Sequence, residues 1–192
     1  MGNAYMTNPL VFLIQILFGT YALVVMLRFL LQLVRADFYN PVSQFIVKAT
    51  SPLLRPLRRL IPSLRGIDMA SIVLMWLVKS AELMLIMLLS GGAMNLLAPL
   101  ALAIPELVGL AIDVFLYAIL IQVILSWVNP GGYNPVIGLI DRLTDPLLRP
   151  ARRIIPAMGG LDLSPMAVMI GLVLLKMLLL PPLQFLTGSL FR

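Results

Sequence analysis

Four charged residues lie inside long apolar stretches of the chain: Lys79, Glu82, Asp113 and Lys176. A charge near the centre of a membrane helix costs about 2.5–3.5 kcal/mol on insertion scales, so each needs a partner or water. Lys79 and Glu82 are three residues apart and can pair on one helix face. We expect Arg28, near the end of the first stretch, to extend to the interface and to carry no function. Buried charges of this kind hold helices together or form an ion or proton path, and both interpretations stay open.

Six arginines form a second candidate site, in two triplets of equal spacing: Arg55, Arg58, Arg59, Arg149, Arg152 and Arg153. Guanidinium groups suit phosphate oxygens, and each basic residue contributes about 1 kcal/mol near an anionic leaflet. The triplets therefore predict binding to anionic lipid headgroups or to a protein partner. A plainer interpretation is that they only fix topology, although topology does not require a repeated register. Nucleic acid is a poorer interpretation, because these basic stretches lack interleaved aromatic residues.

The composition argues against catalysis and against a water-soluble fold. The chain has no Cys and no His, which removes thiolate chemistry and the commonest general base and metal ligand. Asp113 is the only Asp in an expected span, so no catalytic pair presents itself, and no metal or cofactor is expected. Hydrophobic residues make up 61% and charged residues 11%, with a mean hydropathy of +1.04. These values predict an all-α membrane protein.

Four segments are long and apolar enough to span a bilayer, at roughly 8–34, 69–90, 105–128 and 165–187. Asp68 and Ser164 are suitable N-caps, and Pro105 suits a first helical turn. The tandem prolines Pro181-Pro182 are expected to break or end the last helix. Residues 93–104 are apolar but contain a proline, which predicts a short re-entrant or interfacial piece.

An internal repeat relates the two halves of the chain at an offset of 94 residues. Residues 39–68 align with residues 133–162 without a gap, and seventeen of the thirty positions are identical. Two spans separate equivalent points, so the repeats have parallel topology, and the halves are expected to pack with pseudo-twofold symmetry about the membrane normal. The predicted organisation is a first repeat, a connecting segment and a second repeat, at residues 1–92, 93–104 and 105–192.

The repeat places residues of opposite charge at equivalent positions, because Glu82 aligns with Lys176. Our preferred hypothesis is an interhelical Glu82–Lys176 ion pair at the pseudosymmetry axis. That pair would leave Lys79 or Asp113 to find another partner.

Prolines shape the basic segment that each repeat carries between its two spans. Pro52, Pro56 and Pro62 each lack an N–H, which predicts short helical pieces instead of one long helix. This Pro-broken interfacial loop can dip its Leu and Ile side chains into the acyl boundary while its Arg heads reach phosphates. Tyr39 and Asn40 open the segment, and we expect them to act structurally, as a headgroup anchor and a turn opener.

Basic residues also predict the orientation of the protein. Ten of the fourteen Lys and Arg fall in the two repeat loops: Arg35, Lys48, Arg55, Arg58, Arg59, Arg65, Arg142, Arg149, Arg152 and Arg153. The positive-inside rule therefore predicts cytoplasmic loops, with both termini outside.

Each copy of the repeat contains T-x-P-L-L-R-P-x-R-R-x-I-P, followed by Gly-x-Asp and a long apolar helix. These paired blocks closely resemble the YggT family, also called YlmG, over nearly the whole chain. The second copy also has a Gly-Gly-x-Asp-x-Ser-Pro close at residues 159–165, whereas residues 65–71 of the first copy depart from it. The resemblance implies a small bacterial inner-membrane protein with chloroplast relatives. It also implies links to osmotic-stress tolerance, potassium uptake, cell-division gene neighbourhoods and, in plastids, cytochrome assembly and nucleoid organisation.

The favoured function is a non-enzymatic assembly or scaffold factor of the bacterial inner membrane. It would act through its twin cytoplasmic Arg loops on anionic lipid or on a membrane or cell-division protein. A homo-oligomer is a separate expectation. The alternative is a component of ion transport, of potassium in particular, or of osmotic-stress tolerance.

Overall fold

The protein is seen in a computed structural model that describes residues 4–91, 97–128, 134–155 and 162–189. These residues form six helices. A tight turn with one isolated β-bridge lies between the second and the third helix. The helices are α1 (Ala4–Leu33), α2 (Pro41–Leu60), α3 (Met69–Leu89), α4 (Ala98–Val128), α5 (Pro135–Ile154) and α6 (Ser164–Ser189).

Four of the helices, α1, α3, α4 and α6, are long and apolar enough to cross a membrane. Each has a window of mean hydropathy above 2 with at most two charged residues, so each can sit in hydrocarbon with its backbone groups bonded internally. The predicted all-α, four-span membrane architecture is therefore confirmed.

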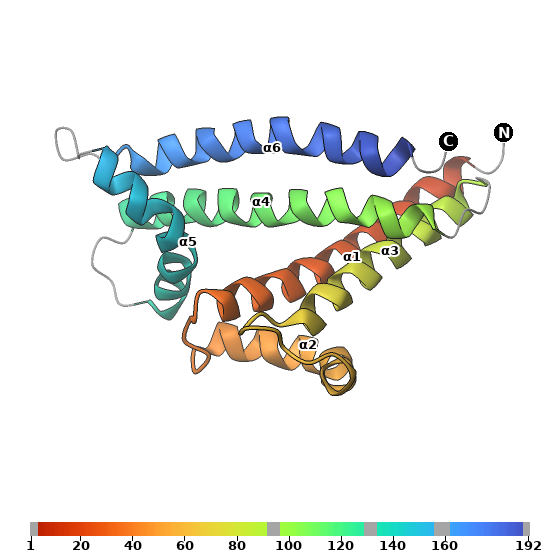
Figure 1. The fold of residues 1–192 in the computed structure, drawn as a ribbon, viewed down its shortest axis with the longest axis horizontal. Helices are drawn as coiled ribbons and strands as arrows, with labels where there is room; N and C mark the ends of the chain where they lie inside the picture. Colours follow the sequence, from red (N-terminus) through yellow and green to blue (C-terminus); the bar gives the residue numbers. More distant parts are fainter. Residues whose placement is uncertain (1–3, 92–96, 129–133, 156–161, 190–192) are drawn as a thin grey trace.

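The spans form two helical hairpins that diverge towards one end of the molecule (Figure 1). α1 packs along α3, α4 packs along α6, and α4 also packs against α3. At the end where the hairpins diverge, α2 lies across α1 and α3, and α5 lies across α4 and α6. The start of α1 and the end of α6 lie at the opposite end (Figure 1). Both basic segments therefore share one side, as the parallel repeat predicts.

The basic segments are continuous helices, which corrects the prediction of Pro-broken loops. α2 contains Pro52 and Pro56, and α5 contains the equivalent Pro146 and Pro150. All four prolines are exposed, so the carbonyls that lose their donors lie on the outer face. A proline φ is also compatible with a helix. Water or headgroups can satisfy the free carbonyls there, and the helices continue.

Two span boundaries also differ from the prediction. α4 begins at Ala98, so Pro105 lies inside the helix, and residues 98–104 belong to a span instead of a re-entrant piece. Residues 92–96 lie outside the described part of the chain. α6 runs through Pro181-Pro182 to Ser189. Because hydrocarbon offers no partner for free backbone groups, a helix in the membrane persists through prolines that would end it in water.

Two buried positions recur in α2 and α5, which lie across the spans and are called the crossing helices below. Thr50 and Leu54 of α2 are fully buried, and so are the equivalent Thr144 and Leu148 of α5. Leu54 joins the larger apolar cluster, which extends from α1 to α5, and Leu148 joins a smaller one with side chains of α4 and α6. Close packing of such side chains is what holds membrane helices together. The internal repeat thus encodes how the helices dock.

Candidate functional site

Each crossing helix starts at a proline that follows an asparagine cap. The Asn40 Oδ1 accepts a hydrogen bond from the backbone N–H of Val42 at 2.8 Å, and Asn134 does the same for Val136 at 2.9 Å. Proline suits the first helical position, where its missing N–H needs no partner. The Asn40 Nδ2 also donates to the carbonyl of Pro135. The structural role expected of the Asn-Pro pair is confirmed, and the first copy also joins the two repeats.

An Arg–Asp pair ties the end of each crossing helix to the span that follows it. Arg58 bonds Asp68 in the first repeat, and Arg152 Nε lies 2.9 Å from Asp162 Oδ2 in the second. Both pairs obey the offset of 94. Their burial differs, since the Asp68 side chain is 5% exposed and that of Asp162 is 39% exposed. Two of the six candidate arginines therefore belong to the framework, by which we mean the contacts that hold the helices of each repeat together.

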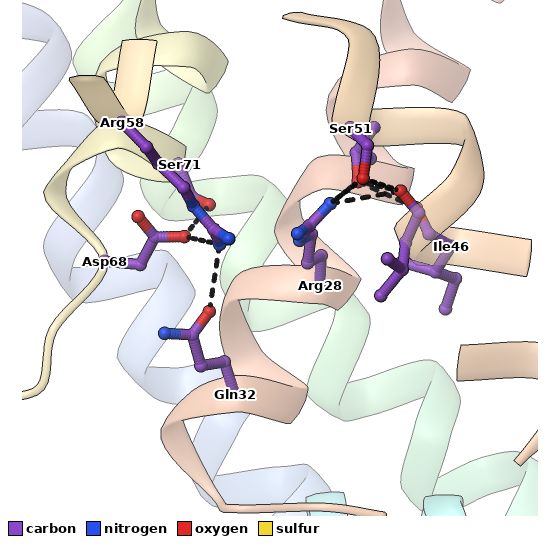
Figure 2. A network of polar contacts seen from close by, with 9 residues as sticks. Arg28, Gln32, Ile46, Ser51, Arg58, Asp68 and Ser71 are labelled. Atoms are coloured by element: carbon purple, nitrogen blue, oxygen red, sulfur yellow. Dashed lines mark hydrogen bonds and ion pairs between the residues drawn. The ribbon is translucent and has the colours of Figure 1, made fainter. Parts of the chain in front are cut away.

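The first of these pairs belongs to a network around the start of α3. Figure 2 shows Arg58 between Asp68 and Gln32, with Ser71 bonded to the same carboxylate. A tight turn with positive φ at Arg65 and Gly66 brings Asp68 back towards α2. Burial raises the pKa of Asp68, but the hydrogen bonds from Arg58 and Ser71 outweigh it and hold the pKa below its usual value.

A second polar contact joins the first span of each repeat to its crossing helix. The Arg28 Nη1 donates to Thr50 Oγ1 at 2.5 Å and to the carbonyl of Val47 at 3.2 Å, and Figure 2 shows it beside Ser51. Arg28 is only 6% exposed, so its head is buried against α2 instead of extending freely into water, which corrects the expectation from the sequence. The hydroxyl and carbonyl groups of α2 replace the water that its charge would otherwise need.

In the second repeat the equivalent contact is made by a neutral residue of the first span. Gln122 occupies the place of Arg28, and its Oε1 accepts from Thr144 Oγ1 at 2.7 Å. Its Nε2 donates to Asp141 Oδ1, also at 2.7 Å. The contact positions are the same in both repeats, whereas the charges differ.

The remaining candidate arginines are exposed on the outer faces of α2 and α5. Arg55, Arg59 and Arg153 form no ion pair within the described ranges. Arg149 lies 2.8 Å from Asp145, one turn away on the same helix, and both side chains are well exposed. An exposed pair of this kind contributes little to stability. These four side chains are therefore the ones placed to reach a partner.

Three of the intramembrane charges lie near the middle of their helices, at Lys79 of α3, Asp113 of α4 and Lys176 of α6. Lys79 Nζ lies 3.0 Å from Glu82 Oε1, which confirms the local pair. Lys176 Nζ lies 2.5 Å from Asp113 Oδ1, so the preferred Glu82–Lys176 pair is wrong. α4 packs between α3 and α6 (Figure 1) and supplies the partner for Lys176.

These three charged residues line a cavity of about 290 Å³ between α1, α3, α4 and α6. Its lining includes Lys79, Asp113, Lys176 and Gln184, together with Glu106, which approaches Lys79 Nζ at 3.8 Å. Glu106 was not among the candidate residues, because the predicted span started beside it. Among the residues that the structure describes, no group of three His, Cys, Asp or Glu could hold a metal ion.

Comparison with known proteins decides the family. A model of the CCB3/YggT family matches residues 7–89 and again residues 101–183. The chain belongs to the CCB3/YggT family. The two matches make it a tandem-repeat member, as the resemblance of its sequence motifs implied.

Relatives of this CCB3/YggT protein occur in Gram-negative bacteria. An uncharacterised protein of Pseudomonas aeruginosa is 48% identical over 180 residues, covering 93% of this chain and 91% of the relative. The uncharacterised YggT of Escherichia coli K12 is 36% identical over 170 residues, covering 88% of each chain. The uncharacterised ycf19 protein of the alga Porphyra purpurea is 35% identical over 68 residues, 35% of this chain and 68% of its own. No solved structure matches the chain.

Proposed function

We propose that this CCB3/YggT protein is a non-enzymatic membrane scaffold or assembly factor. Its two crossing helices would lie in the cytoplasmic headgroup layer of the inner membrane and engage a protein partner or anionic lipid. The observation that carries the proposal is the division of the arginines. One Arg of each triplet is held by an Asp of the framework, whereas the others project from exposed helix faces.

The crossing helices have the three-sided form of an interfacial helix. At 3.6 residues per turn, one side of α2 carries its buried residues, and the flank beside it carries the exposed Val42, Leu53 and Leu60. The other flank carries basic and polar side chains. α5 repeats the pattern with exposed Val136 and Ile154. An apolar flank beside a cationic one suits the boundary between acyl chains and phosphates.

The proposed location follows from two arguments. Helical multi-pass proteins of Gram-negative bacteria belong to the inner membrane, because outer-membrane spans are β-barrels. The clustering of basic residues around α2 and α5 favours the cytoplasmic side for both helices, with the first and last residues of the chain outside.

The test compares two variants that each remove two positive charges. Arg59→Gln with Arg153→Gln removes one exposed cation from each crossing helix at equivalent positions. Arg35→Asn with Arg65→Asn is the matched control, because both arginines are exposed, lie outside the helices and have positive φ, which Asn tolerates. Each variant is purified from native membranes in lipid-preserving nanodiscs, and bound proteins and lipid classes are quantified.

We expect the wild type and the control to retain a stoichiometric protein partner or an anionic lipid shell that the helix variant loses. If all three carry the same proteins and lipids, or only copies of the same chain, the scaffold proposal fails. Equal expression and equal unfolding midpoints in detergent must accompany the comparison, so that a folding defect is not mistaken for lost binding.

A second candidate, a component of ion transport or osmotic response, is favoured by the charged cavity. Charges close to the middle of three spans line it, and intramembrane charges that face a cavity mark transport paths. Because the chain has no Cys, single cysteines report water access. Gln184→Cys lies on the cavity, and Leu178→Cys on the same helix is 75% exposed without lining it.

Transport predicts that an impermeant thiol reagent labels Gln184→Cys and spares Leu178→Cys. It also predicts an ion flux in proteoliposomes that Lys176→Met reduces. Equal labelling of both cysteines, or a flux that Lys176→Met leaves unchanged, would reject this second candidate.

A further inference from the structure

A cavity of about 640 Å³ runs along the basic flank of α2. Gln44, Lys48, Ser51 and Arg55 line it from one helix, and Phe38 borders it from the segment before α2. These four polar residues are spaced three or four apart, so they share one face, and Val47 and Pro52 complete the lining from the same helix. Two cationic heads and an amide therefore border one space, which has the chemistry of an anion site.

A buried cation stands directly behind this cavity. The Arg28 Nη1 lies 3.3 Å from Ser51 Oγ, and Ser51 lines the cavity. Across the described residues, Arg28 pairs with no carboxylate, and its contacts are hydroxyls and a carbonyl. An uncompensated charge in a weakly screened setting raises the potential of the neighbouring space. Arg28 thus strengthens attraction for an anion held beside Lys48 and Arg55.

The second repeat shows what the same surface looks like when it is neutralised. Asp145 replaces Ser51 and binds Arg149, the counterpart of Arg55, at 2.8 Å. Asp141 and Gln122 replace Val47 and Arg28, and they bond each other. The surface of the first repeat therefore has three cations, Arg28, Lys48 and Arg55, and no acid. The equivalent surface of the second repeat has two cations, Arg142 and Arg149, and two acids, Asp141 and Asp145.

We propose that the α2 cavity binds the phosphate group of one anionic membrane lipid, and that the equivalent surface of α5 does not. The inference rests on the proposed function in one respect, the position of α2 in the headgroup layer. Arg and Lys donors suit phosphate oxygens, and the exposed apolar flank of α2 keeps the helix at the depth where lipid phosphates lie. The phosphate enters between Lys48 and Arg55, with Gln44 beside it.

The experiment uses the full chain reconstituted with phosphatidylethanolamine and phosphatidylglycerol. Native mass spectrometry after extraction into detergent counts the phosphatidylglycerol molecules that stay on each chain. We expect one retained molecule in the wild type. Ser51→Asp, which copies the second repeat, changes the local charge by one unit and supplies an internal partner for Arg55, and it should weaken retention about 30-fold. Lys48→Gln should weaken it about five-fold.

Asp145→Ser is the matched control, because it alters the equivalent position of α5 without touching the cavity. It should keep the retained lipid at the wild-type level or add a second one. Lys48 is exposed on the helix surface, so Lys48→Gln tests the site even if Ser51→Asp unfolds. Wild-type retention in both α2 variants overturns the proposal.

Soluble anions separate the two sources of a phosphate group. Glycerol 3-phosphate and inorganic phosphate are added in excess to the lipid-loaded protein. A lipid site keeps its lipid, whereas complete displacement by either anion overturns the lipid assignment in favour of a free phosphate. The outcome is independent of the scaffold test, because that test changes Arg59 and Arg153, which do not line the cavity. Either result can fail while the other stands.

Discussion

The two repeats share a framework and differ in charge at the positions that the framework brings together. Both have an Asn cap, a buried Thr and Leu on the crossing helix, and an Arg–Asp pair at its end. The first repeat places the buried cation Arg28 against its crossing helix, where the second has the neutral Gln122. The residues that dock the helices therefore recur in both repeats, whereas the contact between first span and crossing helix is charged in one repeat and neutral at the first span in the other.

Charged residues that recur in both repeats of this protein can be structural. An arginine that recurs in register can belong to the framework, as Arg58 and Arg152 do. Recurrence alone therefore does not identify a binding residue. Positions where one copy keeps a charge and the other compensates it are better candidates. Arg55 lies near Ser51 on the α2 cavity, whereas its counterpart Arg149 is paired with Asp145.

The largest expected effect concerns the pair that crosses from α4 to α6. Lys176→Met leaves Asp113 without its cation near the middle of the membrane, and a lone charge there costs about 2.5–3.5 kcal/mol. We expect a loss of about 3 kcal/mol in the free energy of unfolding, measured by SDS titration of the purified protein. Adding Asp113→Asn should recover most of that loss.

Charge swaps test the same pairing against the alternative suggested by the repeat. Asp113→Lys combined with Lys176→Asp should fold, whereas either single change should not. If Glu82→Lys combined with Lys176→Glu also restored folding, the geometry that pairs Glu82 with Lys79 would be contradicted.

The second effect contrasts the two Arg–Asp pairs. Asp68→Asn removes the charge from a buried carboxylate that holds Arg58, and we expect a loss of about 2 kcal/mol in unfolding free energy. Asp162→Asn breaks the equivalent pair, but both partners are more than a third exposed, so the loss should stay below about 1 kcal/mol. Equal losses of unfolding free energy in the two variants would contradict the claim that the buried pair is the stronger one.

The sequence was sufficient to predict the spans, the parallel repeat and the shared side of the basic segments, because these follow from hydropathy and register. It did not predict the continuous helices. Proline is expected to interrupt a helix, but Pro52 and Pro56 face outward, where water or headgroups can bond the carbonyls that lose their donors. It also misassigned Lys176, because a pseudosymmetric alignment says nothing about which helix lies between two others. The pairing of Arg58 with Asp68 was detectable, since Arg152 and Asp162 repeat the same separation of ten residues.

The third prediction is a pH dependence of the first Arg–Asp pair. The pKa of Asp68 is lowered in the folded protein, so the pair stabilises fully above the ordinary carboxyl pKa, near 4. The stabilisation is lost as the pH falls through the lower folded pKa. The difference in unfolding free energy between wild type and Asp68→Asn should therefore be constant from pH 8 to about pH 5 and shrink below about pH 4. A difference that grew on acidification would contradict the assigned sign.

The smallest effect separates the two asparagine caps. Loss of a cap typically costs about 1 kcal/mol, so Asn134→Ala should lower the unfolding free energy by about that amount. Asn40→Ala should lower it more, because the Asn40 Nδ2 also donates to the Pro135 carbonyl. Asn40→Asp keeps the capping oxygen and removes the amide donor, so it isolates the contact between repeats, worth about 0.5–1.5 kcal/mol. If Asn40→Asp matches wild type, that contact contributes nothing, and the repeats are held together by helix packing alone.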